Sequence, residues 1–184
     1  MELFDSITDE LAAFIAEQPL FFVATAPSDG GHINLSPKGL DTLRVIDPRT
    51  VAWLDLTGSG NETSAHTAEN GRLTMMFCSF GATARILRLY GRGRTVLPSD
   101  AEFARLRPQF GAALPGERQI LVLEVVRVQT SCGYAVPRLD NPRSRDTLLR
   151  WAENKGPDGV RTYQQAKNTV SIDGLPAPIA AKKS

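Results

Sequence analysis

Hydrophobic positions near the start of the chain follow a helical period and then give way to short apolar runs. Leu11, Phe14 and Ile15 fall on one helical face, and Ser6 or Thr8 can accept the free N–H groups of a first turn. The proline that follows in the sequence ends this element. The sequence therefore predicts one amphipathic helix before the first strand.

Apolar runs rich in strand-forming residues, separated by turn residues, occupy most of the chain up to Thr130. Six or so strands with only short helices between them favour a closed or partly closed antiparallel barrel over a parallel α/β sheet. Both alternating faces of the last run are largely apolar, which predicts a strand buried on two sides. The runs are 20–26 and 32–36, 42–46 and 51–56 as two hairpins, then 73–79, 85–96 and 119–130.

Two short helices are predicted between these strands. Asn61 is a suitable N-cap for a helix that ends near Gly71, and Ser99 with Glu102 forms a capping-box pattern for a helix reaching about Leu106. Both helices are too short to dominate the fold. The expected class is mainly β with flanking helices.

The texture of the sequence changes after the last strand, where prolines interrupt loops and two helical stretches follow at about 144–154 and 160–168. We expect residues 1–130 to form the main domain. Residues 131–184 are expected to be a loop and helical appendage that packs on it and does not fold independently.

Composition and charge exclude several classes of function. The 184 residues carry 21 Lys and Arg against 20 Asp and Glu, a formal charge of +1, which argues against a surface-wide grip on nucleic acid or an anionic membrane. No run approaches the roughly 20 apolar residues of a membrane span, and the acidic N-terminal stretch is unlike a signal peptide. Two cysteines and two histidines at these spacings make no metal site. The expectation is a reduced, cytoplasmic protein.

The segment Thr57–Thr63, T-G-S-G-N-E-T, is the main candidate for binding a phosphate. Gly58 lets backbone N–H groups approach a ligand, Ser59 adds a hydroxyl, and the helix that follows supplies partial positive charge. Arg44 and Arg88 lie on neighbouring predicted strands and can add a cation. An ordinary capped turn is the alternative interpretation of the same segment.

Three further side chains are candidates for contact with a substrate or cofactor. Lys38 follows Ser36 in the turn S-P-K-G, Tyr134 follows the long strand, and His66 lies on the short helix after the glycine-rich segment. A solvated lysine, a tyrosine that caps the core and an exposed histidine are the more ordinary interpretations. Patterns for a serine hydrolase or a dinucleotide-binding βαβ unit do not occur.

From about Leu20 to Gln129 the chain resembles the pyridoxamine 5'-phosphate oxidase-like family, the FMN-binding split β-barrels. The order and spacing of four segments carry the resemblance, and together they cover most of the predicted strands. They are FFVATAPSDGGHINLSPKG, RVIDPRTVAWLDLTGSGNETSAHTAEN, RLTMMFCSF and RILRLYGRGRTV.

The resemblance implies a six-stranded antiparallel split β-barrel that forms a homodimer, with FMN bound at two sites between the subunits. It implies phosphate ligands at the end of the strand and the start of the helix, a basic residue on an upstream strand, and two residues at the edge of the flavin ring. These positions are matched here by Thr57, Asn61 and Thr63, by Arg44, and by Ser36 and Lys38.

The chain departs from the oxidases of this family at several positions. Asn61-Glu62-Thr63 replaces Ser-Arg-Lys, Ile86 replaces a glutamine, and the C-terminal segment lacks the expected tryptophan and arginine. We therefore expect an FMN-dependent oxidoreductase that acts on a small molecule other than pyridoxamine phosphate, with His66 and Tyr134 on the substrate side and no assigned catalytic residue. A flavin- or heme-binding sensor or carrier without turnover, or a reductase that uses deazaflavin F420, is the alternative.

Overall fold

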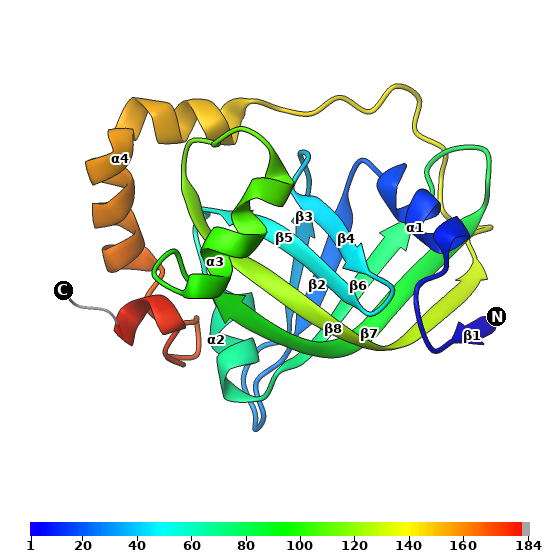
Figure 1. Cartoon of the computed structure of the whole chain (residues 1–184), viewed down its shortest axis with the longest axis horizontal. Coiled ribbons are helices and arrows are strands. Elements are labelled where there is room, and N and C mark those ends of the chain that lie inside the picture. Colours follow the sequence, from blue (N-terminus) through cyan, green and yellow to red (C-terminus); the bar gives the residue numbers. More distant parts are fainter. Residues whose placement is uncertain (182–184) are drawn as a thin grey trace.

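Eight antiparallel strands form one sheet in the computed structural model, which describes residues 1–181 (Figure 1). The order across the sheet is β3-β2-β6-β7-β8-β5-β4, with β1 paired to β8, and the sheet is not closed. The strands are β1 Glu2–Phe4, β2 Phe21–Thr25, β3 Asn34–Lys38, β4 Leu43–Asp47, β5 Thr50–Leu56, β6 Arg72–Cys78, β7 Arg85–Val96 and β8 Glu117–Cys132.

This arrangement confirms the mainly β, antiparallel class and corrects the expected six-stranded barrel to an open sheet of eight strands, seven of which match the predicted runs. The additional β1 is only three residues long and pairs Glu2 with Thr130, at the far end of the longest strand. A segment of this length is too short to show an alternating pattern in the sequence. Its position depends on a partner more than a hundred residues away, so only the folded chain defines it.

The first half of the longest strand, β8, is buried on both faces, as its two apolar faces predicted, whereas Glu124, Val126 and Arg127 in its second half are exposed. Leu121 and Leu123 point into a cluster with residues of β2, β6 and β7, whereas Ile120 and Val122 point into a second cluster beside β5. All four side chains are at most 1% exposed. The strand therefore holds two hydrophobic cores together.

Helices cover the open sides of these two cores. α1 (Asp9–Ala16) places Leu11, Phe14 and Ile15 on the first core, and α3 (Ala101–Leu106) with the 3-10 helix η1 (Arg107–Phe110) covers the second. α2 (Glu62–Glu69) follows β5 and packs beside β7 and β2. The predicted first helix is thus confirmed, with Leu11 N donating to Thr8 Oγ1 at 3.3 Å.

Two of the predicted caps differ from the structure. Asn61 precedes α2, but its side chain makes no capping hydrogen bond. α3 begins after Asp100 rather than Ser99, and Glu102 accepts hydrogen bonds from Arg94 at 2.6 and 2.9 Å. In both cases a partner outside the helix competes with the local capping group for the same side chain.

The C-terminal part crosses over the sheet and packs against the loop after β5 (Figure 1). α4 (Thr147–Lys167) is interrupted at Gly156, whose φ of 66° is left-handed, and η2 (Pro178–Ala181) ends the described chain. The two predicted helical stretches therefore correspond to the two helical parts of α4 on either side of Gly156. The boundary at residue 130 stays a prediction, and residues 182–184 of the expected appendage lie outside the described residues.

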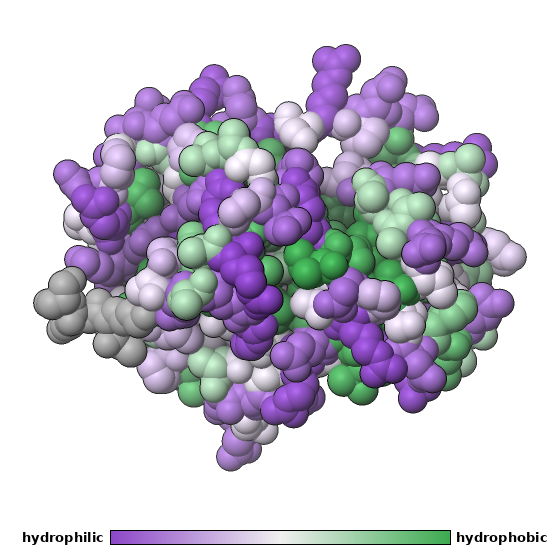
Figure 2. All heavy atoms as spheres, viewed as in Figure 1, coloured by the Kyte–Doolittle hydropathy of each residue, from purple (hydrophilic) through white to green (hydrophobic). Residues whose placement is uncertain are grey.

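The face shown in Figure 2 carries polar side chains at its periphery and a group of hydrophobic ones between α3 and α1. Within residues 1–181, no helix is both long enough and apolar enough to cross a membrane.

Candidate functional site

A polar cleft opens where the ends of β3 and β5, the loop after β5, the first turn of α2 and the C-terminal segment meet. Its volume is about 660 Å³. Backbone and side chains of Gly58–Thr63 form one wall, and residues 166–172 form the opposite one. The other lining residues are Asn34, Ser36, Lys38, Asp55 and Arg118.

A buried ion pair forms the floor of the polar cleft. Asp55 and Arg118 lie on the paired strands β5 and β8, their side chains are 5% and 3% exposed, and Arg118 Nη2 is 2.7 Å from Asp55 Oδ2. Lys38 Nζ is 3.2 Å from Asp55 Oδ1. Burial alone raises the pKa of Asp55, but the charges of Arg118 and Lys38 outweigh it and hold that pKa well below its usual range. The floor is therefore permanently ionised.

Amides extend this floor into a network that joins the strands to the C-terminal segment. Gln119 Nε2 donates to Asp55 Oδ2 at 2.9 Å and to Asn61 Oδ1 at 2.7 Å. Asn61 Nδ2 donates to the backbone oxygen of Asn168, and Asn168 Nδ2 donates to that of Gly58. Because Asn61 is engaged in this way, the first-turn N–H groups of α2 keep no side-chain cap.

Hydroxyl groups line the side of the polar cleft nearest to β3. Asn34 Nδ2 donates to Thr63 Oγ1 at 3.1 Å and Ser36 Oγ donates to Asn34 Oδ1 at 2.6 Å. Thr63 therefore accepts a hydrogen bond from Asn34 and retains its own hydroxyl proton for another acceptor. Ser59, in the loop, is exposed. An uncapped helix start with hydroxyl and cationic neighbours is suited to an anion such as a phosphate.

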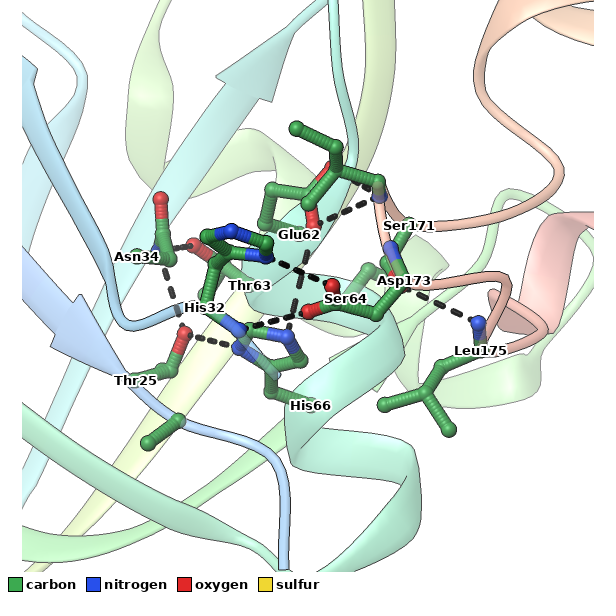
Figure 3. A network of polar contacts seen from close by, with 12 residues as sticks. Thr25, His32, Asn34, Glu62, Thr63, Ser64, His66, Ser171, Asp173 and Leu175 are labelled. Carbon is green, nitrogen blue, oxygen red and sulfur yellow. Dashed lines mark hydrogen bonds and ion pairs between the residues drawn. The ribbon is translucent and has the colours of Figure 1, made fainter. Parts of the chain in front are cut away.

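Glu62 connects the first turn of α2 to the C-terminal segment (Figure 3). Its two carboxylate oxygens lie 3.0 and 3.1 Å from the backbone nitrogen of Ile172, which donates to them. Nearby, Asp173 accepts from both the backbone and the side chain of His32, at 2.8 and 2.7 Å. The carboxylate of Glu62, on α2, and that of Asp173, on the C-terminal segment, thus hold this segment beside the cleft.

His66 lies beneath the cleft rather than on its surface, because its side chain is fully buried. Its Nδ1 is 3.0 Å from Thr25 Oγ1, and its Nε2 is 4.0 Å from Glu62 Oε2 with no hydrogen-bond partner among the described residues (Figure 3). The ordinary interpretation of this residue as an exposed helix histidine is therefore wrong. Its ring faces the preceding turn of the same helix with one nitrogen and β2 with the other.

A second cleft, the apolar cleft, lies on the other side of the same loop and has a volume of about 1000 Å³. It shares Lys38, Asp55, Gly58 and Ser59 with the polar cleft. Its walls come from the ends of β3 and β5 on one side and from residues 139–163 on the other. The two clefts are therefore adjacent and communicate across the loop.

Six of the predicted binding residues line the polar cleft: Ser36, Lys38, Gly58, Ser59, Asn61 and Thr63. Thr57 lines the apolar cleft instead. Its hydroxyl donates to the backbone oxygen of Gly116 at 2.8 Å and accepts from Gln164 Nε2 at 2.7 Å. Both hydrogen-bonding roles of this hydroxyl are occupied by the chain itself.

Three other predicted residues lie away from both clefts. Arg44 pairs with Asp41, donates to the backbone oxygen of Gln109 and lies over the Phe110 ring. Arg88 Nη1 donates to Ser131 Oγ, and Tyr134 is 87% exposed. None of the three is among the residues that line the clefts.

The sequence analysis missed the buried charges Asp55 and Arg118 and the amides Asn34 and Asn168. An aspartate inside the apolar run VAWLDL was a usable signal, because a buried carboxylate requires a cationic partner. Nothing local identifies that partner, since Arg118 lies 63 positions further along the chain. The contribution of residues 166–172 likewise depends on how the appendage packs.

Comparison with known proteins agrees with the fold and adds a family. Residues 7–132 match the family described as pyridoxamine 5'-phosphate oxidase. The chain is 42% identical to the pyridoxamine 5'-phosphate oxidase family protein ustO of Aspergillus flavus, over 94% of this chain and 76% of that protein.

Two solved structures share the fold at low sequence identity. The structure of a putative pyridoxamine 5'-phosphate oxidase from Lactobacillus delbrueckii has a TM-score of 0.55 at 17% identity, covering 70% of this chain and 99% of that one. HupZ of Group A Streptococcus has a TM-score of 0.52 at 23% identity, covering 66% of this chain and 91% of that one. Because the family match and the 42% identical relative each span most of this sequence, the chain belongs to the pyridoxamine 5'-phosphate oxidase family.

Proposed function

We propose that this protein is an oxidoreductase that binds FMN and holds the phosphate of the cofactor in the polar cleft. The observation that carries the proposal is the uncapped first turn of α2, which lies in the polar cleft together with several hydroxyl groups and three cations, Lys38, Arg118 and Lys167. Free N–H groups and the positive end of a helix favour a phosphate at this place. Membership in the family makes FMN the most specific candidate for that phosphate.

The donor set fits the group, although it differs from the Ser-Arg-Lys pattern expected from the resemblance. Ser59 and Thr63 supply hydroxyl groups, and Lys38 and Arg118 supply positive charge at the floor of the cleft. Asp55 neutralises part of that charge, and Glu62 adds a negative charge at the rim. FMN binding in this cleft therefore depends on backbone and hydroxyl donors more than on a surplus of cations.

A bound FMN would supply hydride and electron transfer, and the residues of this chain bind and orient it and exclude water. Lys38 has a special position because it lines both clefts. Its ammonium is held by Asp55, which fixes it at the junction where a cofactor in one cleft meets a substrate in the other. Neither His66 nor Tyr134 reaches this junction, so we no longer assign them to the substrate side.

We also propose that two chains form a homodimer and that the substrate is a small molecule other than pyridoxamine phosphate. In support of a shared interface, β3 is an edge strand beside the polar cleft and carries Leu35 65% exposed, with Ile33 79% exposed just before it. Sedimentation equilibrium measures the assembly directly. A single species of one chain at micromolar concentration would contradict the dimer.

The test of the cofactor is the spectrum and mass of what purifies with the protein, followed by titration of the apoprotein with FMN. Lys38→Met is expected to weaken FMN binding about tenfold, since a charge-assisted contact is lost. Arg88→Met, which removes an arginine outside both clefts, is the matched control and should leave the affinity within about twofold.

A colourless protein that binds no added FMN would overturn the proposal, and a different mass would identify heme or deazaflavin instead. Turnover is measured separately, as steady consumption of reduced nicotinamide with an electron acceptor. FMN binding without any turnover would favour a sensor or carrier.

A further inference from the structure

The apolar cleft has the size and lining of a site for a small organic ligand. Sites for small molecules commonly enclose about 300 to 1000 Å³ and are lined by apolar and aromatic groups. The barrel contributes one wall and the appendage contributes the other, so the cleft exists only where the two pack together. Its apolar lining consists of Leu20, Leu40, Leu54, Leu56 and Phe80 from the barrel side and Leu139, Leu148, Trp151 and Tyr163 from the appendage.

The appendage wall presents two aromatic rings in a fixed arrangement. The rings of Trp151 and Tyr163 pack edge to face with centroids 5.0 Å apart, and both side chains are half-buried. Lys155 lies over them, with its Nζ 5.3 Å from the centre of the Trp151 ring. Contact with each other and with Lys155 restrains these rings, which lowers the entropic cost of binding a flat or extended apolar group.

The charges around the apolar cleft favour an anion. Lys38, Arg143 and Arg145 line it, whereas Asp55 is the single carboxylate in the lining and is already paired with Arg118 and Lys38. Among residues 1–181, Arg143 and Arg145 take part in none of the hydrogen bonds or ion pairs found. Two exposed, unpaired guanidinium groups at the mouth are suited to a carboxylate.

We propose that the apolar cleft binds the substrate, and that the substrate is a carboxylic acid with an aromatic or long aliphatic body. The apolar body lies between the barrel leucines and the Trp151 ring, and the carboxylate lies at Arg143 and Arg145. This substrate role rests on the proposed function, because the shared residues Lys38 and Ser59 place the ligand next to the cofactor. Binding of the acid in the cleft does not depend on the cofactor.

The test uses two fluorescent probes of the same body and different charge, dansylglycine and dansylamide. Trp151 lies in the cleft and Trp53 is 1% exposed in the core, so energy transfer from tryptophan reports on occupancy. Dansylglycine is expected to bind to one site per chain, about tenfold more tightly than dansylamide. The titration is carried out on the full chain, with and without added FMN.

Variants locate the probe. Replacing both Arg143 and Arg145 by glutamine should weaken dansylglycine binding about tenfold and leave dansylamide unchanged. Arg150→Gln is the matched control, since Arg150 lies in the first turn of α4 just after these two residues, pairs with Asp146 and does not line the cleft. Leu148→Glu, at a position 37% exposed, should abolish binding without unfolding the chain, and Val126→Glu on β8, 62% exposed, is its control.

Several outcomes would overturn the proposal. They are equal affinity for the two probes, no effect of the double arginine variant, displacement of dansylglycine by FMN, or a dimer that excludes the probe and dissociates in Leu148→Glu. The first two reject an acid site, the third assigns the cleft to the flavin, and the fourth assigns it to a second copy of the chain.

The acid site in the apolar cleft and the FMN-dependent oxidoreductase function can be rejected independently. If the probe binds as expected but no flavin is bound, the acid site stands and the oxidoreductase function falls. If flavin binds but the acid probe does not, only the substrate class is rejected.

Discussion

The polar and apolar clefts use the two sides of one loop, yet they are held in shape by different forces. The polar cleft rests on Asp55 and Arg118, which are buried and joined by hydrogen bonds to three further residues, Lys38, Gly60 and Gln119. The apolar cleft is formed by side-chain surfaces on a helix that contacts the barrel through few polar bonds, such as that from Gln164 to Thr57. A buried hydrogen-bond network fixes the polar cleft, whereas the shape of the apolar cleft depends on how α4 packs against the sheet.

The largest effect is expected when the positive charge of Arg118 beneath the polar cleft is removed. Arg118→Met leaves the Asp55 carboxylate buried with only Lys38 as a charged partner. The free energy of unfolding should fall by about 3–5 kcal/mol, the usual cost of an uncompensated buried charge. Urea unfolding followed by circular dichroism measures this change.

Arg127→Met is the control for that variant. Arg127 is 50% exposed and lies 3.9 Å from Asp5, so its loss should change the free energy of unfolding by less than about 1 kcal/mol. If Arg118→Met and Arg127→Met were equally stable, the buried pair would not be what holds the floor of the polar cleft.

A smaller difference between the two clefts is expected when the negative charge at the rim of the polar cleft is removed. Glu62→Gln removes a negative charge from the polar cleft but keeps an oxygen that can accept from the Ile172 N–H. FMN affinity should rise about three- to tenfold, because repulsion of the phosphate is relieved. Binding of dansylglycine in the apolar cleft should change less.

Glu69→Gln is the matched variant, since Glu69 lies at the other end of the same helix and outside both clefts. Calorimetric titration with FMN distinguishes the two variants. An unchanged affinity in Glu62→Gln would place the phosphate away from the start of α2.

The smallest expected effect is a dependence of the C-terminal segment on pH. The hydrogen bond to Asp173, and then its charge, raises the pKa of His32 above 6.5, and the hydrogen bonds from His32 lower the pKa of Asp173. The stabilisation that the charged pair gives to the segment is therefore fully present below the ordinary histidine pKa and is lost as pH rises through the raised one, whereas the hydrogen bond from the His32 backbone N–H remains. The stabilisation also weakens in acid, as pH falls through the lowered pKa of Asp173.

Hydrogen exchange of the amides of residues 171–175, corrected for the intrinsic rate at each pH, tests this. Protection should be lower at pH 8.5 than at pH 6, and His32→Gln should remove the difference. Equal protection of the unaltered protein at the two pH values would show that this ion pair does not hold the segment.

Most of the fold follows from local sequence patterns. The strand runs, the amphipathic first helix and its Thr8 cap depend on residues close together in the chain. The number of strands and the caps of α2 and α3 were predicted less well. There, the partners lie in other elements: Thr130 and Asn168 are more than a hundred positions away in the sequence, and Arg94 is on β7, before α3.

The residues of the candidate site also fall into those that local sequence predicts and those that it does not. The glycine-rich loop and the S-P-K-G turn were identified because backbone freedom and turn chemistry are local properties. The choice among arginines was not predictable, since Arg44, Arg88 and Arg118 all lie on or beside strands with similar patterns. Only the pairing of β5 with β8 places Arg118, rather than Arg44, beside Asp55.

The sequence by itself determined a mainly β chain of near-neutral charge, with a loop suited to a phosphate and a separate helical segment after the last long strand. The tertiary structure decided which residues surround the loop and the helical segment. Strand register set the buried charges beneath the polar cleft, and packing of α4 against the barrel created the apolar cleft beside it. Propensity and alternation act between neighbouring residues, whereas charge pairing and cavity formation depend on contacts that only the folded chain brings together.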